Sequence, residues 1–333
     1  MKWGLDLLKV GIVGVGGMGS IHLQNWRKMD VSLAAICDKR FELAQERAIG
    51  DERCYHTLEE MLASEQLDIL DVCTPTDCHK EQSIIAMDAG IHVLCEKPVA
   101  LSVSDALEML EAAERNNVKF MAAQVVRFMS DYIGLFELCK SGVYGKIVQA
   151  NFWRLSPTPK WSSENWMMDE KRSGAVPFDL HIHDADFMVS LLGKPTAVSA
   201  VRTKPQNSSY PDYYTVRYEY PSAMVTAEAS WYAGANPFQV GYRVMMQEAV
   251  VENIGGKVTI YKNDGTVIES GNAFPAENTG INLTSTDGYF EEQRYFKNCV
   301  LNDCKTDFIK KQDILDVIEI IAEGVNTSVV KYC

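Results

Sequence analysis

The sequence predicts an α/β protein in two parts: a doubly wound parallel sheet, followed by an α+β domain with an open, mainly antiparallel sheet. From residue 9 to about residue 125, short apolar runs alternate with helical segments, as in strand-helix-strand units. From residue 196 to residue 268, aromatic and β-branched runs are separated by Gly, Pro, Asn and Asp, which favours antiparallel strands. We therefore expect one domain over residues 1–125 and a second over residues 126–333, with the C-terminal helices as candidates to pack back on the first.

The composition excludes several classes of partner. The chain has 333 residues, enough for two domains that each bury a core, and its net charge of −13 would not attract nucleic acid or an anionic membrane. No apolar stretch approaches the roughly 18 residues of a membrane span, and the opening residues leave no room for a secretion signal. The nine cysteines are scattered and never in CxxC spacing. We expect reduced thiols in a cytoplasmic protein, with neither disulfides nor a zinc site.

The stretch from residue 9 to residue 38 has the pattern of a dinucleotide-binding turn. An apolar run is followed by GVGGMG, by an amphipathic helix and by a second apolar run. In such a turn Gly14 permits the tight bend, Gly16 lets the backbone approach a pyrophosphate, and Gly19 lets the helix pack closely on the strand. The helix N-terminus, which includes Gly17 and Met18, then meets the phosphates. A glycine-rich turn in a fold that binds something else is the alternative.

Asp38 ends the second apolar run, nineteen positions after Gly19. A carboxylate there can accept hydrogen bonds from a ribose 2'-hydroxyl and would repel a 2'-phosphate, which favours NAD over NADP. The adjacent Lys39 and Arg40 are cations, so NADP stays open.

Further elements of the first part follow in order. We expect helices over 40–49, from 57, over 78–89 and over 104–116, and strands over 67–73, 91–95 and 119–123. Thr57 and Glu60 form a capping-box pattern. Ligands of open α/β sheets bind at the carboxyl ends of the strands, so Thr74 and Pro75 fall on the cofactor edge. Lys97 follows the strand over 91–95 and precedes a proline that must end it, so we expect Lys97 to point into the crevice.

The second part begins near residue 126. We expect helices over 131–139, 287–301 and 312–325, and strands over 147–155, 213–220, 223–231, 238–250, 257–261 and 266–269. The segment 156–173 carries Trp161 and Trp166 and is either a binding loop or a surface loop that its tryptophans anchor.

The segment FDLHIHDADF, residues 178–187, concentrates acids and histidines ahead of an apolar run. If it is helical from about Pro177, Asp179 and His183 share one face and Asp186 lies one further turn along. A carboxylate one turn from an imidazole can orient it and support its protonated form, which prepares a general base. Asp-x-His-x-His is also typical of metal-dependent hydrolases, whose two histidines project from a strand end. The other four histidines all precede this segment, so we expect no metal.

These pieces together resemble the glucose-fructose oxidoreductase / inositol dehydrogenase / MocA family. The matching motifs are GVGGMG with Asp38, CTPTDCH, AGIHVLCEKP and SGAVPFDLHIHDADFMVSLLG, in that order and over nearly the whole chain. The resemblance implies a Rossmann domain, then an α/β domain whose open sheet forms a homodimer or homotetramer interface. It also implies NAD, or NADP, as cofactor and a sugar, sugar derivative or cyclitol as substrate.

The resemblance assigns catalytic roles to Lys97, Asp179 and His183 in the oxidation of a secondary hydroxyl or its reverse. It places Thr74, Pro75, His79, Glu96 and Lys97 along the cofactor. Further substrate contacts are plausible for Arg127, Trp161, Trp166 and Tyr242. Ala175 stands where many members have glycine, and His181 where Gly or Thr is frequent; we favour packing for His181. Two other functions share these motifs: an NAD-dependent hydrolase or eliminase with transient oxidation, and a dinucleotide-binding regulator without catalysis.

Overall fold

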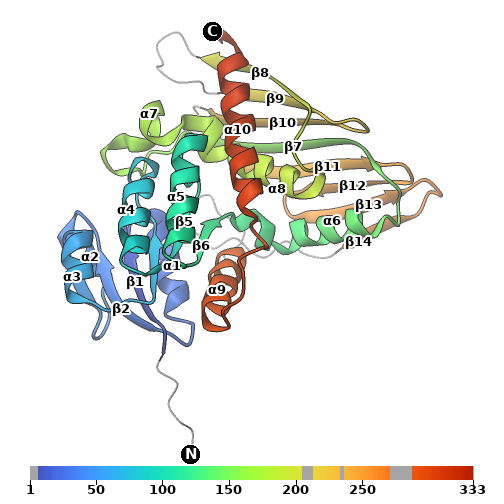
Figure 1. Cartoon of the computed structure of the whole chain (residues 1–333). Helices are drawn as coiled ribbons and strands as arrows, with labels where there is room; N and C mark the ends of the chain where they lie inside the picture. Colours follow the sequence, from blue (N-terminus) through green and yellow to red (C-terminus); the bar gives the residue numbers. More distant parts are fainter. Residues whose placement is uncertain (1–6, 205–212, 233–235, 271–286, 333) are drawn as a thin grey trace, which may run out of the picture. The chain divides into compact units, whose positions relative to one another are not determined.

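The computed structural model describes residues 7–204, 213–232, 236–270 and 287–332 (Figure 1). The first six residues, on which the expectation about a secretion signal partly rests, and Cys333 lie outside the described residues. The chain divides into two compact units. The first comprises residues 1–124 and 289–311, and the second comprises residues 125–288 and 312–333. Most of the helix over 287–301 therefore belongs with the first unit.

The first unit contains a six-stranded parallel sheet of order β3-β2-β1-β4-β5-β6. The strands are β1 Lys9–Val13, β2 Ser32–Cys37, β3 Arg53–Tyr55, β4 Ile69–Val72, β5 His92–Glu96 and β6 Phe120–Ala123. This is the strand order of the doubly wound dinucleotide-binding fold, so the predicted fold class of the first part is confirmed. Among the six strands of this sheet, only β3, three residues long, had no predicted range.

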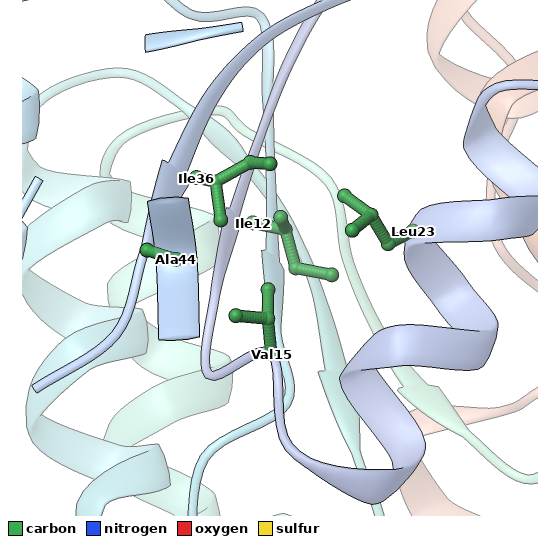
Figure 2. Packing of buried hydrophobic residues seen from close by; sticks show 5 residues of the cluster. All are labelled: Ile12, Val15, Leu23, Ile36 and Ala44. Atoms are coloured by element: carbon green, nitrogen blue, oxygen red, sulfur yellow. The ribbon is translucent and has the colours of Figure 1, made fainter. Parts of the chain in front are cut away.

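Helices flank this sheet: α1 Gly17–Trp26, α2 Phe41–Arg47, α3 Leu58–Ser64, α4 Thr76–Asp88, α5 Val103–Arg115 and α9 Asp287–Leu301. The capping box predicted at Thr57 and Glu60 is confirmed, with both of its hydrogen bonds formed. Figure 2 shows part of the core, in which Leu23 of α1 and Ala44 of α2 pack with Ile12 and Ile36 of the central strands. The glycine-rich turn is thus mounted on a buried strand and a helix packed against it.

The second unit contains a nine-stranded sheet of order β14-β13-β12-β11-β7-β10-β9-β8-β15. Its strands are β7 Ile147–Pro157, β8 Ala197–Lys204, β9 Tyr213–Glu219, β10 Met224–Tyr232, β11 Gln239–Met246, β12 Ala249–Ile254, β13 Lys257–Lys262, β14 Val267–Ser270 and β15 Val329–Tyr332. Only β7 with β10 and β8 with β15 pair in parallel among these strands. The predicted mainly antiparallel sheet is confirmed.

Two local predictions for the second unit are wrong. The single strand expected over 238–250 is a hairpin, β11 and β12, which reverses at Gln247 and Glu248. No Gly or Pro marks that reversal, so the apolar run reads as continuous. The segment 156–173 is only partly a loop. It contains the short helix α7, Glu170–Ser173, and the 3₁₀ segment Ser163–Met168, which is interrupted at Glu164 and Asn165 by positive φ angles.

Helices α6 Ser130–Ser141, α8 Ile182–Leu192 and α10 Lys311–Thr327 pack on one face of the second sheet (Figure 1). Burial alternates along β9, with every second residue exposed on the other face. None of the helices within the described ranges is long and apolar enough to cross a membrane.

Candidate functional site

The turn between β1 and α1 requires glycine at two of its three predicted positions. Gly14 has φ +84°, and a Cβ there would lie 2.8 Å from the backbone of Cys73. A Cβ at Gly19 would lie 1.8 Å from the carbonyl oxygen of Gly14, so only glycine lets α1 approach β1 this closely. At Gly16 the nearest described atom to a Cβ is Nη2 of Arg40, at 3.5 Å. The backbone in front of Gly16 is therefore open to a ligand.

Gly16 is also the N-cap of α1, and no side chain caps that helix end. The N–H groups of its first turn, which includes Gly17 and Met18, and the positive end of the helix dipole suit a pyrophosphate. The turn thus fits the predicted dinucleotide, with the phosphates at Gly16 and the helix N-terminus.

Asp38 is buried at the end of β2 and already has several donors. Its carboxylate accepts hydrogen bonds from the Val15 N–H at 3.0 Å and from the backbone and side chain of Arg40 at 2.9 to 3.2 Å. Arg40 therefore compensates the charge of Asp38, a pairing that the sequence did not predict. Lys39, next to it, is exposed.

The ends of β4 and β5 hold the next predicted residues. Pro75 is the N-cap of α4, and the Thr74 hydroxyl donates to the side-chain oxygen of Gln82 at 2.6 Å. His79 is buried, with its ring nitrogens 2.9 Å and 2.7 Å from the carbonyl oxygens of Pro98 and Thr74. Burial lowers its pKa. His79 thereby joins the two strand-end turns, while its direct contact with a cofactor stays a prediction.

Lys97 directly follows β5 in a turn with a cis Lys97–Pro98 peptide bond. The N–H of Lys97 donates to Oε2 of Glu96 at 3.0 Å, and Lys97 is only half-buried whereas Glu96 is buried. The lysine thus leaves the strand end at the edge where ligands of such sheets bind.

Asp179 and His183 stand out in the second unit by their exposure. Of residues 173–189, every one except Asp179 and His183 is buried. The predicted α-helix from Pro177 is wrong in detail: residues Val176–Leu180 form a π-helical turn, and α8 begins at Ile182. Single π-helical turns are frequent at functional sites. The two residues are the only ones in this packed segment that keep part of their surface accessible.

Two buried arginines anchor α8 beside them. Arg154 of β7 binds Asp184 at 2.8 Å, and Arg127 binds Asp186 at 2.7 Å and Asp313 at 2.8 Å. Burial raises the pKa of Asp184 and of Asp186, and the paired arginines oppose that rise. Removing one member of such a pair leaves an uncompensated buried charge, at a cost of about 3–5 kcal/mol. The guanidinium of Arg127 is thus held by carboxylates, and its substrate contact stays a prediction.

His181 is fully buried, as its predicted packing role requires. Its Nε2 lies 2.7 Å from the Tyr218 hydroxyl and its ring stacks on that of Tyr218. Burial, with a smaller contribution from Arg154, lowers the pKa of His181 to about 3. The Asp-x-His-x-His motif therefore lies on a π-helical turn and a helix, not at a strand end, and its first histidine faces a tyrosine. This geometry differs from that of metal-dependent hydrolases.

The tryptophans and Tyr242 differ in exposure. Trp161 is exposed and Trp166 is half-buried in the 3₁₀ helix. Tyr242 is fully buried and donates to the carbonyl of Asp131 at 2.9 Å, which leaves it no surface for a substrate. Trp166 remains the better candidate for a substrate contact.

Comparison with known families agrees with this geometry. Residues 8–124 match the model of an oxidoreductase family with an NAD-binding Rossmann fold, and residues 132–252 match the C-terminal domain model of the GFO/IDH/MocA family. The chain belongs to the GFO/IDH/MocA oxidoreductase family. The predicted resemblance is confirmed, and the first unit is an NAD-binding Rossmann domain.

Similar proteins include enzymes with two kinds of chemistry in their names. A D-glucoside 3-dehydrogenase of Escherichia coli is 31% identical over 58% of this chain and 56% of its own length. A 2,7-anhydro-N-acetylneuraminate hydratase of the same species is 29% identical over 69% of this chain and 63% of its own length. A crystal structure of myo-inositol 2-dehydrogenase from Lactobacillus plantarum superimposes with a TM-score of 0.81 at 21% identity, covering 96% of this chain and 97% of that one.

One group of residues was missed by the sequence predictions. His22 of α1 and Asp71 of β4 are both fully buried and lie 2.9 Å apart. The signal was present, since an aspartate inside the apolar run over 67–73 must find a partner when buried. The partner's identity was not readable, because it lies 49 positions away.

Proposed function

We propose that this protein is an NAD(P)-dependent oxidoreductase that transfers a hydride between nicotinamide and a secondary hydroxyl of a sugar, sugar derivative or cyclitol. The observation that carries the proposal is the selective exposure of Asp179 and His183 in a segment that is otherwise buried. A carboxylate and an imidazole kept accessible on a rigidly anchored turn suit proton transfer. The dehydrogenase among the similar proteins supports the same chemistry.

In this mechanism Lys97, Asp179 and His183 serve the same reaction. His183 takes the hydroxyl proton at an imidazole nitrogen, and Asp179 supports the resulting cation. Lys97 donates a hydrogen bond from Nζ to the substrate oxygen and stabilises the charge that develops as the proton leaves. Bound NAD would supply the hydride acceptor, with Gly14, Gly16 and Gly19 shaping the turn that receives its phosphates.

NAD rather than NADP is the proposed cofactor. Asp38 lies where the ribose 2'-hydroxyl is expected and is the only predicted anion there. Arg40 is already paired with that carboxylate, so its charge is less available to a 2'-phosphate.

Elimination or hydrolysis with transient oxidation is the second candidate, because one similar protein is a hydratase. The three proposed catalytic residues would serve it equally, since it begins with the same removal of a hydroxyl proton and hydride. A regulator without catalysis is less well supported, because a sensor needs no accessible acid–base pair.

We also propose a cytoplasmic homodimer or homotetramer formed through the open face of the nine-stranded sheet. Exposed apolar side chains on strands of that sheet include Val201, Tyr213, Met224, Met245 and Ile254. An interface between copies of the chain would cover them. Sedimentation of wild type and of Met224→Glu should separate an oligomer from a smaller species.

The substitution Lys97→Met tests the assignment of the site. It should leave NAD binding nearly unchanged and lower kcat by about a hundredfold or more, because it removes a cation that stabilises developing negative charge. NADH formation with a panel of sugars and polyols measures the rate. The matched control is Lys80→Met, since Lys80 on α4 pairs with Asp105 and Glu108 on α5.

Three outcomes separate the candidates. NADH formation that Lys97→Met abolishes and Lys80→Met preserves supports the dehydrogenase. Cleavage or elimination that needs NAD but yields no net NADH supports the second candidate. Full activity of Lys97→Met would show that the catalytic site is placed wrongly.

A further inference from the structure

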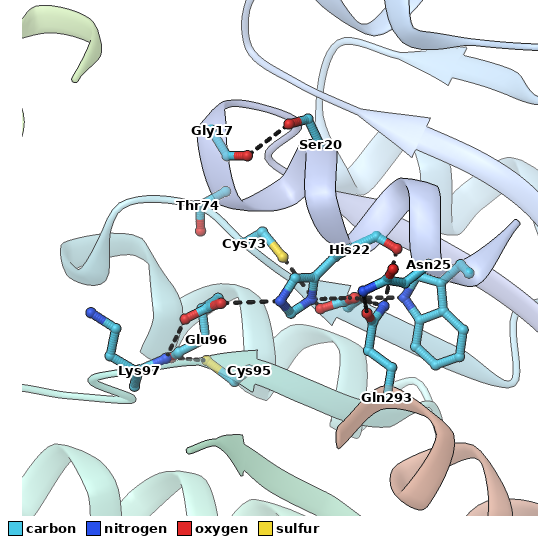
Figure 3. A network of polar contacts seen from close by, with 12 residues as sticks. Gly17, Ser20, His22, Asn25, Cys73, Thr74, Cys95, Glu96, Lys97 and Gln293 are labelled. Atoms are coloured by element: carbon cyan, nitrogen blue, oxygen red, sulfur yellow. Dashed lines mark hydrogen bonds and ion pairs between the residues drawn. The ribbon is translucent and has the colours of Figure 1, made fainter. Parts of the chain in front are cut away.

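His22 joins the helix of the glycine turn to the strand that carries Lys97. Its Nδ1 lies 2.9 Å from Oδ2 of Asp71, and its Nε2 lies 3.1 Å from Oε1 of Glu96. Figure 3 shows the imidazole of His22 beside Glu96, with Lys97 beyond Glu96 on the side away from His22. The ring is completely buried, so water cannot substitute for either partner.

Each ring nitrogen of His22 thus lies close to a carboxylate oxygen, an arrangement that favours a proton on both. A neutral imidazole has one N–H, and its other nitrogen would turn a lone pair toward a carboxylate oxygen. Asp71 already acts as an acceptor, because the Trp26 indole N–H donates to Oδ2 at 2.6 Å and the Cys73 thiol to Oδ1 at 3.3 Å.

The pKa shifts of His22 and Glu96 agree with a protonated imidazole beside ionised carboxylates. Burial lowers the pKa of His22, but Asp71 raises it, and the net pKa lies well above the ordinary value. Burial likewise raises the pKa of Glu96, whereas His22 and Lys97 lower it, so the net pKa of Glu96 is lowered. Among the described residues, the Cys73 thiol also faces the imidazole, and the ring centroid of Tyr289 on α9 lies 6.1 Å from that of His22. An imidazolium between two carboxylates is the state that the site favours.

The other oxygen of Glu96 reaches the reacting residue. Oε2 of Glu96 accepts the Lys97 N–H at 3.0 Å, while Oε1 faces His22. The carboxylate therefore has one oxygen on the histidine and one on the backbone of the turn that presents Lys97. Without the contact from His22, Glu96 would be a buried carboxylate that could rotate or take up a proton.

We propose that His22 is a positioning residue, a buried imidazolium that fixes Glu96 and through it the turn that presents Lys97. This inference rests on the proposed role of Lys97. It also gives α1 a second function, because the helix whose N-terminus faces the phosphates holds, one turn further on, the brace of the residue that contacts the substrate. Asn25 and Gln293 complete the brace, because Gln293 accepts from Asn25 at 3.0 Å and donates to the His22 carbonyl at 3.1 Å.

A metal site is the competing explanation for part of this cluster. Ligand atoms of His22, Asp71 and Cys73 lie within 4.8 Å of one another. An imidazole protonated on both nitrogens offers no lone pair to a metal, and both oxygens of Asp71 already accept from N–H or S–H donors. The hydrogen-bond count favours the brace.

Two substitutions test separately the contact of His22 with Asp71 and its contact with Glu96. The amide nitrogen of Asn can replace Nδ1, and that of Gln can replace Nε2. His22→Asn should thus keep the bond to Asp71 and lose Glu96, whereas His22→Gln should keep Glu96 and lose Asp71. Because a displacement of about 1 Å can cost a hundredfold in rate, we expect kcat of His22→Asn to fall roughly ten- to a hundredfold and that of His22→Gln to fall much less. The KM for NAD should change little in both variants.

The comparison separates failure of this inference from failure of the proposed function. If Lys97→Met is inactive but the two His22 variants have equal kcat per folded molecule, His22 has only a structural role and Lys97 keeps its assignment. If Lys97→Met is fully active, the proposed function fails first. Stoichiometric zinc in the purified wild type that His22→Gln loses would establish the metal site and overturn the brace.

The protonation state can be measured on the wild type, even if both variants fail to fold. Nitrogen-15 NMR of labelled histidines should show both His22 ring nitrogens still protonated at a pH above the ordinary histidine pKa of about 6.5. A neutral ring in that range would overturn the inference. Since the folded pKa is raised, the stabilisation is complete at low pH and is lost as the pH rises through that pKa. The unfolding temperature of the wild type should therefore decline at alkaline pH, and this decline should be smaller in His22→Gln.

Discussion

Ala175 offers a test of the backbone that leads into the catalytic turn. It adopts φ 51° and ψ −152°, a combination found almost only in glycine, and its side chain is fully buried. Such a conformation costs about 1–3 kcal/mol in a residue with a Cβ. Glycine adopts this conformation without a steric penalty, so Ala175→Gly should relieve the strain.

The magnitude follows from comparison with a second alanine. Ala185 is equally buried but lies inside α8 with ordinary helical geometry. Each Ala→Gly change removes one buried methyl group, worth about 0.8 kcal/mol, and adds freedom to the unfolded chain, worth about 0.5–1 kcal/mol. Ala185→Gly should thus destabilise by about 1.5 kcal/mol. Ala175→Gly loses the same stabilisation, but it also relieves the backbone strain. Its net effect on the free energy of unfolding should therefore be near zero.

Scanning calorimetry of the two variants measures the difference. A gap of about 2 kcal/mol corresponds to roughly 4–8 °C for a domain of the second unit's size, since each kcal/mol shifts the transition by about 2–4 °C. We expect Ala175→Gly to melt near wild type and Ala185→Gly to melt lower by that amount. Equal losses in the two variants would refute the strain at Ala175.

Two further predictions concern the dinucleotide turn. Gly19→Ala places a Cβ 1.8 Å from the Gly14 carbonyl oxygen and should destabilise the first unit by about 1–3 kcal/mol and weaken NAD binding, as calorimetry and titration with NAD would show. Gly134→Ala, in a helix position with no described atom within 4 Å of the new Cβ, is the neutral or stabilising control; equal behaviour of the two would contradict the close approach. Asp38→Ala releases Arg40 and should shift the kcat/KM ratio toward NADP by about tenfold or more, which is about 1.4 kcal/mol. An unchanged ratio would mean that Asp38 does not contact the ribose.

Much of the fold was predictable because its signals are local. A strand of period two, a tight glycine turn and a capped helix each depend on residues a few positions apart. The first strand and helix, the capping box at Thr57 and most strands of the second unit's sheet therefore follow from the sequence. Strands β8 and β15 had no predicted range. The hairpin at Gln247 was not predicted, because two antiparallel strands without a Gly or Pro between them have the same sequence pattern as a single long strand.

The sequence identified the candidate site residues that belong to motifs. Residues in a recognisable pattern, such as Lys97 before proline and Asp179 four positions before His183, could be singled out from the sequence. The buried ion pairs that hold the surrounding helix in place could not be predicted from the sequence. Arg127 and Asp186 are 59 positions apart, and Arg154 and Asp184 are 30 apart, so no sequence window contains both members of either pair.

The sequence by itself determined the family, the dinucleotide turn and the identity of the candidate catalytic residues, because glycine geometry and motif spacing are encoded within short segments. Only the tertiary structure decided which charges pair. It paired Arg40 with Asp38 and placed His22 between Asp71 and Glu96. It also buried every residue of the segment 173–189 except Asp179 and His183. Burial and long-range pairing depend on how strands and helices pack, and in a low-dielectric interior that packing decides which side chain is charged and which stays accessible.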